Sequence, residues 1–177
     1  MVCGGLAGPD ITDACYEYDP MSDTWAQVGA MSEPLEFRGT ASHPSLGMVA
    51  VGGLPSTSAA ESTLDGVTFT SLPDLPVREY HNCLVALSDG SLVSIGGEAS
   101  LATDNKVYRL PMGAEQWEEL PETIYQRSGS SCGVTTDADG REVIVVAGGD
   151  NRQPRENHEI LDVETLQWRE GGKSTVA

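Results

Sequence analysis

The chain alternates between short apolar runs and polar turns, and one apolar run recurs four times. Its fullest copy is Val143 to Gly149, a run rich in β-branched residues that ends in two glycines. A short apolar run of this kind, bounded by glycine, is typical of a strand buried on both faces. The copies end at the glycine pairs Gly4–Gly5, Gly52–Gly53, Gly96–Gly97 and Gly148–Gly149. These pairs are 48, 44 and 52 residues apart, so the chain consists of four units of one design.

Each unit continues with a polar loop and an alternating hairpin. In the first unit Ala14 to Tyr18 alternates, Asp19 to Thr24 has turn chemistry, and Trp25 opens the return strand. One large aromatic ring follows the second glycine of every pair by 16 to 20 residues: Trp25, Phe69, Trp117 and Trp168. A ring at a nearly fixed offset suits a repeated core, because it buries the most apolar area from one position. We therefore expect all four rings to lie in the core.

A second hairpin precedes each later glycine pair. In the third unit His81 to Leu87 and Leu92 to Ile95 flank a turn at Ser88 to Ser91. Prolines such as Pro73 and Pro121 follow the strand that carries the ring, and they end it because proline cannot donate to a ladder. Each complete unit is therefore predicted to form four antiparallel strands, and the first unit lacks its leading strand. The predicted repeats cover 1–37, 38–77, 78–126 and 127–177.

These units are too small to bury their own apolar faces. At about 45 residues each they must gain stability by packing against one another. The 20 Gly and 10 Pro among 177 residues fit many short strands and turns. Four-stranded antiparallel sheets packed face to face around an axis form a β-propeller. The sequence therefore predicts an all-β propeller, with an amphipathic helix over 156–169 as the alternative for that part of the fourth unit.

The repeated pattern resembles the kelch repeat. Tyr18-Asp19-Pro20 followed by Trp25, and Arg127 through Gly148–Gly149 to Trp168, carry the resemblance, which covers essentially the whole chain. The second unit departs from the pattern because it lacks the tryptophan. The resemblance implies a kelch-type β-propeller of about four blades, three complete and a first one that lacks one strand, within a larger ring of six or seven. The remaining blades would come from the same longer chain or from a second copy.

Charge and hydropathy exclude several classes of partner. Acidic side chains number 27 against 10 basic ones, for a formal net charge of -17, and such a field repels phosphate. We expect no nucleic-acid partner; solvated acidic loops explain the charge, and a preference for a basic partner is the alternative. No apolar stretch reaches the roughly 20 residues of a membrane helix, so no membrane insertion is expected. The N-terminus shows no secretory leader, although Met1 opens within a repeat and a leader could lie upstream.

No motif for a cofactor or a metal is present. The glycine pairs lack the further glycines, the lysine and the βαβ context of phosphate-binding loops, so they are interpreted as packing residues. His43, His81 and His158 fall at different places in their units, and no His or Cys spacing suits a metal. The sequence therefore predicts neither a metal site nor a cofactor.

The sequence indicates different roles for Cys3 and Cys15 and for Cys83 and Cys132. Cys3 precedes the first glycine pair and Cys15 lies on the neighbouring strand of the predicted blade, where two facing cysteines meet disulfide geometry. A disulfide there implies an oxidising compartment, and two buried thiols in a cytoplasmic protein are the alternative. Several secreted kelch-like proteins carry a similar Cys-Gly-Gly, so the resemblance favours an extracellular location. Cys83 and Cys132 each follow a unit arginine by five residues, so they are interpreted as equivalent buried thiols rather than as a bonded pair.

The resemblance also suggests a binding face. In some kelch proteins the arginine that opens each unit and the residues after the glycine pair line a pocket where loops converge on the axis. Carried over to this sequence, the candidate partner-binding residues are Arg38, Arg78, Arg127, Glu98, Asp150, Asn151, Tyr80 and Tyr125. Arginine and tyrosine are frequent in interface hot spots. The alternative is that the arginines brace neighbouring loops through contacts with carbonyls and carboxylates.

The function that this resemblance implies is binding. We predict a protein-binding or scaffold module that uses propeller-face loops, with another protein as partner and no catalysis by this segment. One alternative is a piece of a carbohydrate-active enzyme with a kelch propeller, similar to galactose oxidase or to sialic-acid epimerases, although no residue here matches the copper ligands of such oxidases. An actin-filament cross-linker is the other alternative. A fold alone does not establish any of these functions.

Overall fold

The computed structural model of the protein describes residues 1–55, 57–99, 102–150 and 157–173. These residues form strands and turns, and no helix is present among them, so the prediction of an all-β chain is confirmed. The strands are β1 (Val2–Cys3), β2 (Leu6–Ala7), β3 (Asp10–Ile11), β4 (Ala14–Asp19), β5 (Thr24–Ala30), β6 (Gly39–His43), β7 (Gly47–Val51), β8 (Ala60–Thr63), β9 (Thr70–Leu72), β10 (Cys83–Ala86), β11 (Leu92–Ala99), β12 (Ala102–Leu110), β13 (Glu118–Leu120), β14 (Ser128–Thr136), β15 (Glu142–Asp150), β16 (Asn157–Asp162) and β17 (Gln167–Lys173).

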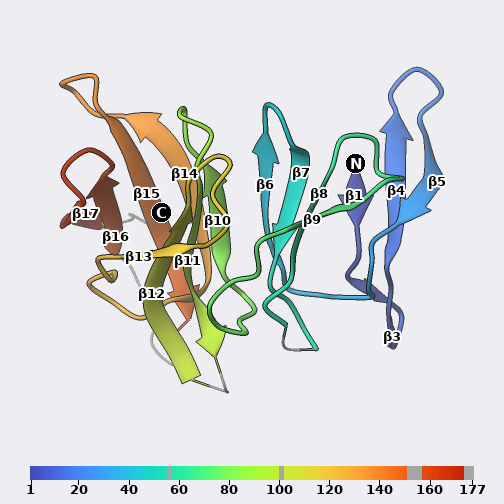
Figure 1. Ribbon diagram of the computed structural model, residues 1–177, viewed down its shortest axis with the longest axis horizontal. Coiled ribbons are helices and arrows are strands. Elements are labelled where there is room, and N and C mark those ends of the chain that lie inside the picture. Colours follow the sequence, from blue (N-terminus) through green and yellow to red (C-terminus); the bar gives the residue numbers. More distant parts are fainter. Residues whose placement is uncertain (56, 100–101, 151–156, 174–177) are drawn as a thin grey trace.

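Four antiparallel sheets follow one another in chain order, from the blue β4 and β5 at one end of the molecule to the red β17 at the other (Figure 1). The second, third and fourth sheets have the strand orders β6-β7-β8-β9, β10-β11-β12-β13 and β14-β15-β16-β17. The first sheet has only three strands, in the order β1-β4-β5, and the hairpin β2-β3 follows its glycine pair. Strands β16 and β17 occupy the described part of 156–169, so the alternative of a helix there is wrong.

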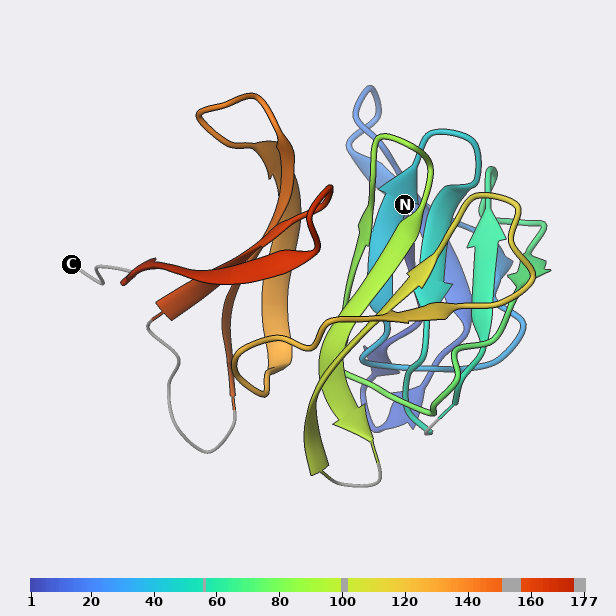
Figure 2. The same ribbon diagram turned by 60° about the vertical axis from the view of Figure 1, so that its left-hand side comes forward.

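The sheets form a row rather than a closed ring. Figure 2, turned by 60°, shows the fourth sheet in orange and red, with the third sheet beside it and the first on the far side of the molecule. The first and the fourth sheets therefore lie at opposite ends of the row. Each inner sheet packs against its two neighbours in the sequence.

The glycine pairs let consecutive sheets approach each other closely. The second glycine of the first three pairs donates its N–H to a carbonyl of the segment that leads into the next sheet, at 2.8 to 3.0 Å, in the pairs Gly5–Leu35, Gly53–Glu79 and Gly97–Arg127. The first glycine has no room for a side chain, because a Cβ on Gly52 or Gly96 would lie 2.3 or 2.5 Å from that same carbonyl oxygen. Both of these glycines also have positive φ, where other residues are strained. A larger residue would therefore push two sheets apart.

A second set of backbone hydrogen bonds joins the sheets where β6, β10 and β14 begin. These are the first strands of the second, third and fourth sheets, and we call the edge that they form the inner edge. The Gly129 N–H donates to the His81 carbonyl at 2.9 Å, and the His81 N–H donates to the Phe37 carbonyl at 2.8 Å. All three residues have a positive φ, of 56° to 63°. Phe37, His81 and Gly129 therefore mark one structural position that recurs where β6, β10 and β14 begin.

Three of the four aromatic rings pack against the preceding unit. Trp117 is 8% exposed, and its indole N–H donates to the Pro73 carbonyl at 2.7 Å. Trp168 likewise donates to the Pro121 carbonyl at 2.8 Å. Phe69 packs against the small apolar cluster between the first two sheets. The rings therefore attach each sheet to the one before it.

The apolar core lies between sheets and differs in size from one interface to the next. Two large clusters join the second sheet to the third and the third to the fourth, and they include Val49, Val51, Leu84 and Leu92 in one and Val93, Ile95, Ile144 and Val146 in the other. Among the described residues, the cluster between the first and second sheets has three buried members, Cys15, Met31 and Leu35. The first sheet is therefore the most weakly attached.

Trp25 does not follow the rule for the rings, and the expectation that it lies in the core is wrong. It is 56% exposed on β5, where its ring contacts the Tyr18 ring at a centroid distance of 5.2 Å. The other rings are covered because each packs on the preceding unit. The described residues contain no sheet before the first one, so this indole has no preceding unit on which to pack.

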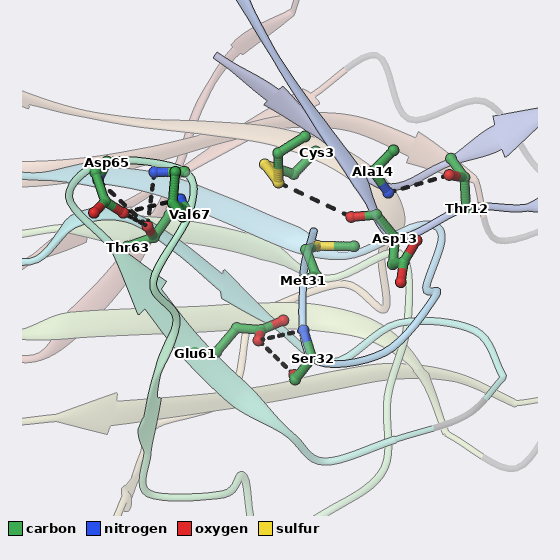
Figure 3. Close-up of a disulfide and its surroundings, with 12 residues drawn as sticks. Cys3, Thr12, Asp13, Ala14, Met31, Ser32, Glu61, Thr63, Asp65 and Val67 are labelled. Carbon is green, nitrogen blue, oxygen red and sulfur yellow. Dashed lines mark hydrogen bonds between the residues drawn. A yellow bond between two sulfur atoms is a disulfide. The ribbon is translucent and has the colours of Figure 1, made fainter. Parts of the chain in front are cut away.

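Cys3 and Cys15 form a disulfide, as predicted (Figure 3). They are paired residues of β1 and β4, with their Cα atoms 4.1 Å apart. Because β1 has only two residues, few ladder hydrogen bonds hold it in place. The disulfide therefore fixes this short strand to the first sheet.

Cys83 and Cys132 also form a disulfide, so the expectation of two separate buried thiols is wrong. Cys83 pairs with Ile95, directly before a glycine pair, whereas Cys132 pairs with Val146, two residues before its own pair. The two cysteines are therefore one residue out of step, and a shift of one residue reverses the face to which a side chain points. Cys83 thus faces the fourth sheet and Cys132 faces the third. Their Cα atoms are 6.0 Å apart, within the range that a disulfide spans.

Trp117→Ala and Trp25→Ala form a matched pair that tests the direction of packing. Removing the Trp117 ring leaves a cavity between two sheets, so we expect the free energy of unfolding to fall by about 3 to 5 kcal/mol. Trp25→Ala removes an exposed ring and should cost less than about 1 kcal/mol. Urea denaturation followed by circular dichroism measures both changes. Equal losses would contradict the conclusion that each ring packs on the preceding unit.

Candidate functional site

Three rings and a carboxylate lie together where the innermost strands β6 and β10 begin. The Phe37 and His81 rings are 4.3 Å apart between centroids, and the His81 ring is 5.2 Å from that of Tyr80. Glu98, directly after the third glycine pair, receives hydrogen bonds from the same region. We call the residues Phe37, Tyr80, His81, Glu98 and Ser128 the inner-edge cluster.

Glu98 is the centre of hydrogen bonding in this cluster. The Ser128 hydroxyl donates to it at 2.6 Å, the Tyr80 hydroxyl donates at 2.8 Å, and Nδ1 of His81 lies 3.5 Å away. Donation from Ser128 above all, and then from Tyr80 and His81, lowers the pKa of Glu98 below its ordinary value. The hydrogen bond from the Tyr80 hydroxyl to Glu98 also raises the pKa of Tyr80. The cluster therefore holds a charged carboxylate beside a partly exposed imidazole.

Phe37 and His81 carry side chains at a backbone position that favours glycine. Their φ values are 56° and 57°, in the left-handed region, and the equivalent residue of the fourth unit is Gly129. Holding another residue in this conformation costs about 1 to 2 kcal/mol. Phe37 is 46% exposed, so burial offsets only part of that cost. Phe37 is therefore an exposed ring, and His81 a partly exposed one, at a strained backbone position.

Two of the candidate binding residues, Arg38 and Arg127, are buried in ion pairs. Arg38 pairs with Glu61, and Arg127 pairs with Glu159 at 2.6 Å. Both guanidinium groups also donate to backbone carbonyls of their own unit. Each arginine side chain is 5% exposed or less. These contacts match the bracing role that the sequence left as the alternative.

Glu61 and Glu159 each also hold the linker that arrives from the preceding unit. Glu61 accepts the N–H and the hydroxyl of Ser32 (Figure 3), and Glu159 accepts the Ile124 N–H at 2.6 Å. Reasoning from the sequence missed both acids. The available signal was an acid eight or nine residues before the ring of the unit. Each acid therefore joins an arginine, a strand and a linker.

Arg78 does not repeat this arrangement. It is exposed, while the neighbouring Glu79 is buried. The carbonyl that accepts the Gly53 N–H belongs to Glu79, and the carbonyl that accepts the Gly97 N–H belongs to Arg127. Glu79 rather than Arg78 therefore takes the position of Arg127 in the third unit.

The other candidates do not all lie together. Tyr80 and Glu98 meet in the inner-edge cluster. Tyr125 donates its hydroxyl to a carboxylate of β17, and its ring centroid lies 5.9 Å from the Arg127 guanidinium. Asp150 ends β15, and Asn151 lies outside the described residues. The structure therefore brings together two of the residues that the sequence nominated and adds Phe37, His81 and Ser128 to them.

Glu79 is a buried acid next to the inner-edge cluster. It accepts the Ser94 hydroxyl at 2.7 Å, Ser94 accepts the Asn82 amide N–H at 2.9 Å, and Asn82 accepts the Gly39 N–H at 3.0 Å. Burial raises the pKa of Glu79 to about 8. The carboxyl group is therefore mostly protonated at pH 7, and the chain of hydrogen bonds links the second sheet to the third.

Comparison with known proteins gives this chain no relative: no protein-family model and no curated protein matches the sequence. Among the residues that the structure describes, no three His, Cys, Asp or Glu side chains gather as a metal ion would require. No helix in the same residues has the length and apolar character needed to cross a membrane. Function is therefore inferred from the geometry of the chain itself.

Glu79→Gln tests the protonation of this buried acid. The pKa of about 8 in the folded state lies above the ordinary value of 4.5, so the folded state keeps a proton that the unfolded state releases. The stability that Glu79 contributes is therefore complete below about pH 4 and falls by up to about 1.4 kcal/mol per pH unit until about pH 8. Glutamine is neutral at every pH. We expect the variant to exceed the wild type in stability at pH 8 and to lose this advantage toward pH 5, in urea denaturation at each pH. A difference that is constant with pH would contradict the assignment.

Proposed function

We propose that this chain is a segment of a kelch-type β-propeller that binds another protein through the inner-edge cluster and catalyses no reaction. The four sheets are successive blades in this proposal. The observation that carries it is the pair of rings, Phe37 and His81, which are held in left-handed backbone beside the charged Glu98.

Three contacts that repeat at fixed positions support the propeller. The glycine N–H donates to the unit that follows, and the N–H groups along the inner edge and the indole N–H groups donate to the unit that precedes, so each kind of contact recurs between consecutive units. Contacts that recur between consecutive units add each sheet to the one before it, as blades are added in a propeller. The kelch-like pattern of the sequence agrees with this arrangement.

The two ends of the row support further blades. A Cβ on Gly148 would meet no described atom within 4 Å, whereas a Cβ on its counterparts Gly4, Gly52 and Gly96 would lie 2.3 to 2.7 Å from the carbonyl oxygens of Leu35, Glu79 and Arg127. At the other end, the exposed Trp25 lacks the sheet on which its counterparts pack. The remaining blades of the proposed ring come from the same longer chain or from a second copy.

The inner-edge cluster has the composition of a protein-binding surface. Aromatic rings supply a large contact area, and they are enriched among the residues that dominate binding energy. His81 and Glu98 add polar groups that fix the orientation of a partner. Because the chain has a net charge of -17, the expected partner carries basic groups at its contact surface.

The disulfides favour an extracellular location for this function. The structure contains Cys3–Cys15 and Cys83–Cys132, which together account for all four cysteines of the chain. Structural disulfides persist in oxidising compartments and are rare in the cytosol. We therefore place the proposed binding outside the cell.

Photo-crosslinking from position 37 tests the proposal. p-Benzoylphenylalanine in place of Phe37 keeps an aromatic ring there, and the same group in place of Met21, which is 92% exposed in the turn after β4, is the matched control. With the secreted proteins of the source organism, we expect position 37 to link to one protein that position 21 does not link to. Unlabelled wild-type chain should compete for this link.

A competitor with Phe37→Asn and His81→Asn completes the test. Asparagine tolerates the left-handed conformation, so the variant should keep the far-ultraviolet circular dichroism of the wild type. We expect it to compete at least about tenfold less well, because the hot-spot rings are gone. Equal competition, or the same linked proteins at positions 37 and 21, would contradict binding through the inner-edge cluster.

A further inference from the structure

An apolar pocket lies between the second and the third sheet, at the end of these sheets that is opposite to the inner-edge cluster. The cluster lies where β6 and β10 begin, whereas the pocket lies at the turns that follow these strands, at the top of Figure 1. Its volume is about 170 Å³. The residues that line it include Leu46, Leu72, Leu92, Leu110 and Met112. We call it the turn pocket.

The floor of the turn pocket is the apolar core itself. Leu92 and Leu110 are 1% and 6% exposed, and both belong to the apolar cluster that joins the second sheet to the third. Leu46 and Leu72 pack against the same cluster. A cavity of about 150 Å³ lined by side chains of this kind is large enough to bind benzene. The turn pocket therefore has room for one apolar side chain of the size of leucine.

Two buried polar side chains hold the walls of the turn pocket in place. Nδ1 of His43, which is 3% exposed, accepts two N–H groups of the β6–β7 turn at 3.1 and 3.0 Å. The ring proton is therefore on Nε2, which donates to the Gly90 carbonyl at 3.1 Å. The indole N–H of Trp117 holds the Pro73 carbonyl, and both carbonyls belong to residues that line the pocket. The pocket is thus formed before a ligand arrives, which lowers the cost of binding.

The fourth unit covers its own apolar cluster with a leucine that the third unit lacks. The residue two positions before Trp168 is Leu166, which packs against the cluster between the third and fourth sheets. The residue two positions before Trp117 is Glu115, and it is exposed. The chain therefore supplies this leucine at one interface between sheets and not at the other.

Acidic side chains surround the turn pocket. Asp74, Asp89 and Glu115 are exposed, and each is the sequence neighbour of a residue that lines the pocket. The nearby Arg109 already pairs with Asp89 at 2.6 Å and with Glu118 at 3.6 Å, so it does not offset the other acids. An acidic rim on a chain with a net charge of -17 attracts lysine and arginine.

We propose that the turn pocket is a second docking site, which binds a leucine side chain of a partner protein in a segment where lysine or arginine flanks that leucine. The leucine covers Leu92 and Leu110, and the flanking cations face the acidic rim. A second copy of this acidic chain would bring further acids to the rim, so the occupant is a different protein. The inference does not depend on a partner at the inner-edge cluster.

Peptide titration followed by NMR tests this occupant. The probe is the peptide Gly-Lys-Leu-Lys-Gly, and the matched controls carry alanine in place of leucine or glutamate in place of both lysines. The chain is isotope-labelled in its methionine methyl groups, so that Met112 reports the pocket and Met21, which is 92% exposed in the turn after β4, is the internal control. Met112→Leu assigns the Met112 signal.

We expect the probe to shift the Met112 signal and leave that of Met21 in place. The burial of one leucine and the charge of the rim should give a dissociation constant of about 0.1 to 1 mM, at least about tenfold tighter than either control. Equal binding of the three peptides would overturn the proposal. So would an unshifted Met112 signal at about 5 mM probe.

Variants of the chain locate the bound leucine. Ala114→Leu fills the pocket from within and should weaken binding of the probe at least about tenfold. Ala138→Leu, the same change in the exposed β14–β15 turn, should leave it unchanged. Far-ultraviolet circular dichroism checks that both variants fold. Full binding by folded Ala114→Leu would contradict the proposal.

A change of charge without a change of shape gives an independent test of the rim. Glu115→Gln should reduce the discrimination between the lysine and glutamate peptides, whereas Glu164→Gln, in the corresponding turn of the fourth unit, should preserve it. His81→Asn should leave binding of the probe unchanged, so this test and that of the proposed function can fail separately. Sedimentation of the chain alone is measured in parallel. A dimer that is lost with Ala114→Leu would make a second copy the occupant and would overturn the proposal.

Discussion

The close approach of each glycine pair to the next unit is the constraint on which the rest of the structure depends. At Gly52 and Gly96 a side chain would overlap the carbonyl oxygen that accepts the hydrogen bond of the following glycine. This contact sets the distance between sheets at their inner edge. It thereby allows the rings of Trp117 and Trp168 to reach the prolines of the preceding unit. Since no unit buries a sufficient core alone, the spacing between sheets determines whether the chain folds.

The buried charges follow from the same packing. A linker must pass from the outer strand of one sheet to the inner edge of the next, and its backbone groups need partners away from water. Glu61 and Glu159 supply these partners, and buried arginines neutralise them. Arg38 and Arg127 come from different positions of their units. Their acidic partners, Glu61 and Glu159, both lie on the third strand of their sheets. A buried ion pair is stable only when its remaining hydrogen bonds are made, and here both acids also bind a linker.

The strands, the order of the sheets and the Cys3–Cys15 disulfide could be predicted, because alternation, glycine pairs and neighbouring strands are local features of the sequence. The Cys83–Cys132 disulfide could not, since counting from an arginine placed the two residues in step when the ladders are offset by one. The exposure of Trp25 depends on which sheet precedes it, which no pattern within a unit reveals. The resemblance nominated two members of the inner-edge cluster. Phe37 and His81 were missed because nothing in a non-glycine residue signals a positive φ.

Comparing Gly96→Ala with Gly148→Ala tests the role of the glycine pairs most directly. Both glycines have positive φ, of 59° and 69°, so both alanines introduce a similar backbone strain of about 1 to 2 kcal/mol. Only the alanine at position 96 would also meet the Arg127 carbonyl of the next sheet. In urea denaturation we expect Gly96→Ala to lower the free energy of unfolding by at least about 1 to 3 kcal/mol more than Gly148→Ala does. Equal losses at the two positions would contradict the conclusion that close approach at the glycine pairs sets the spacing of the sheets.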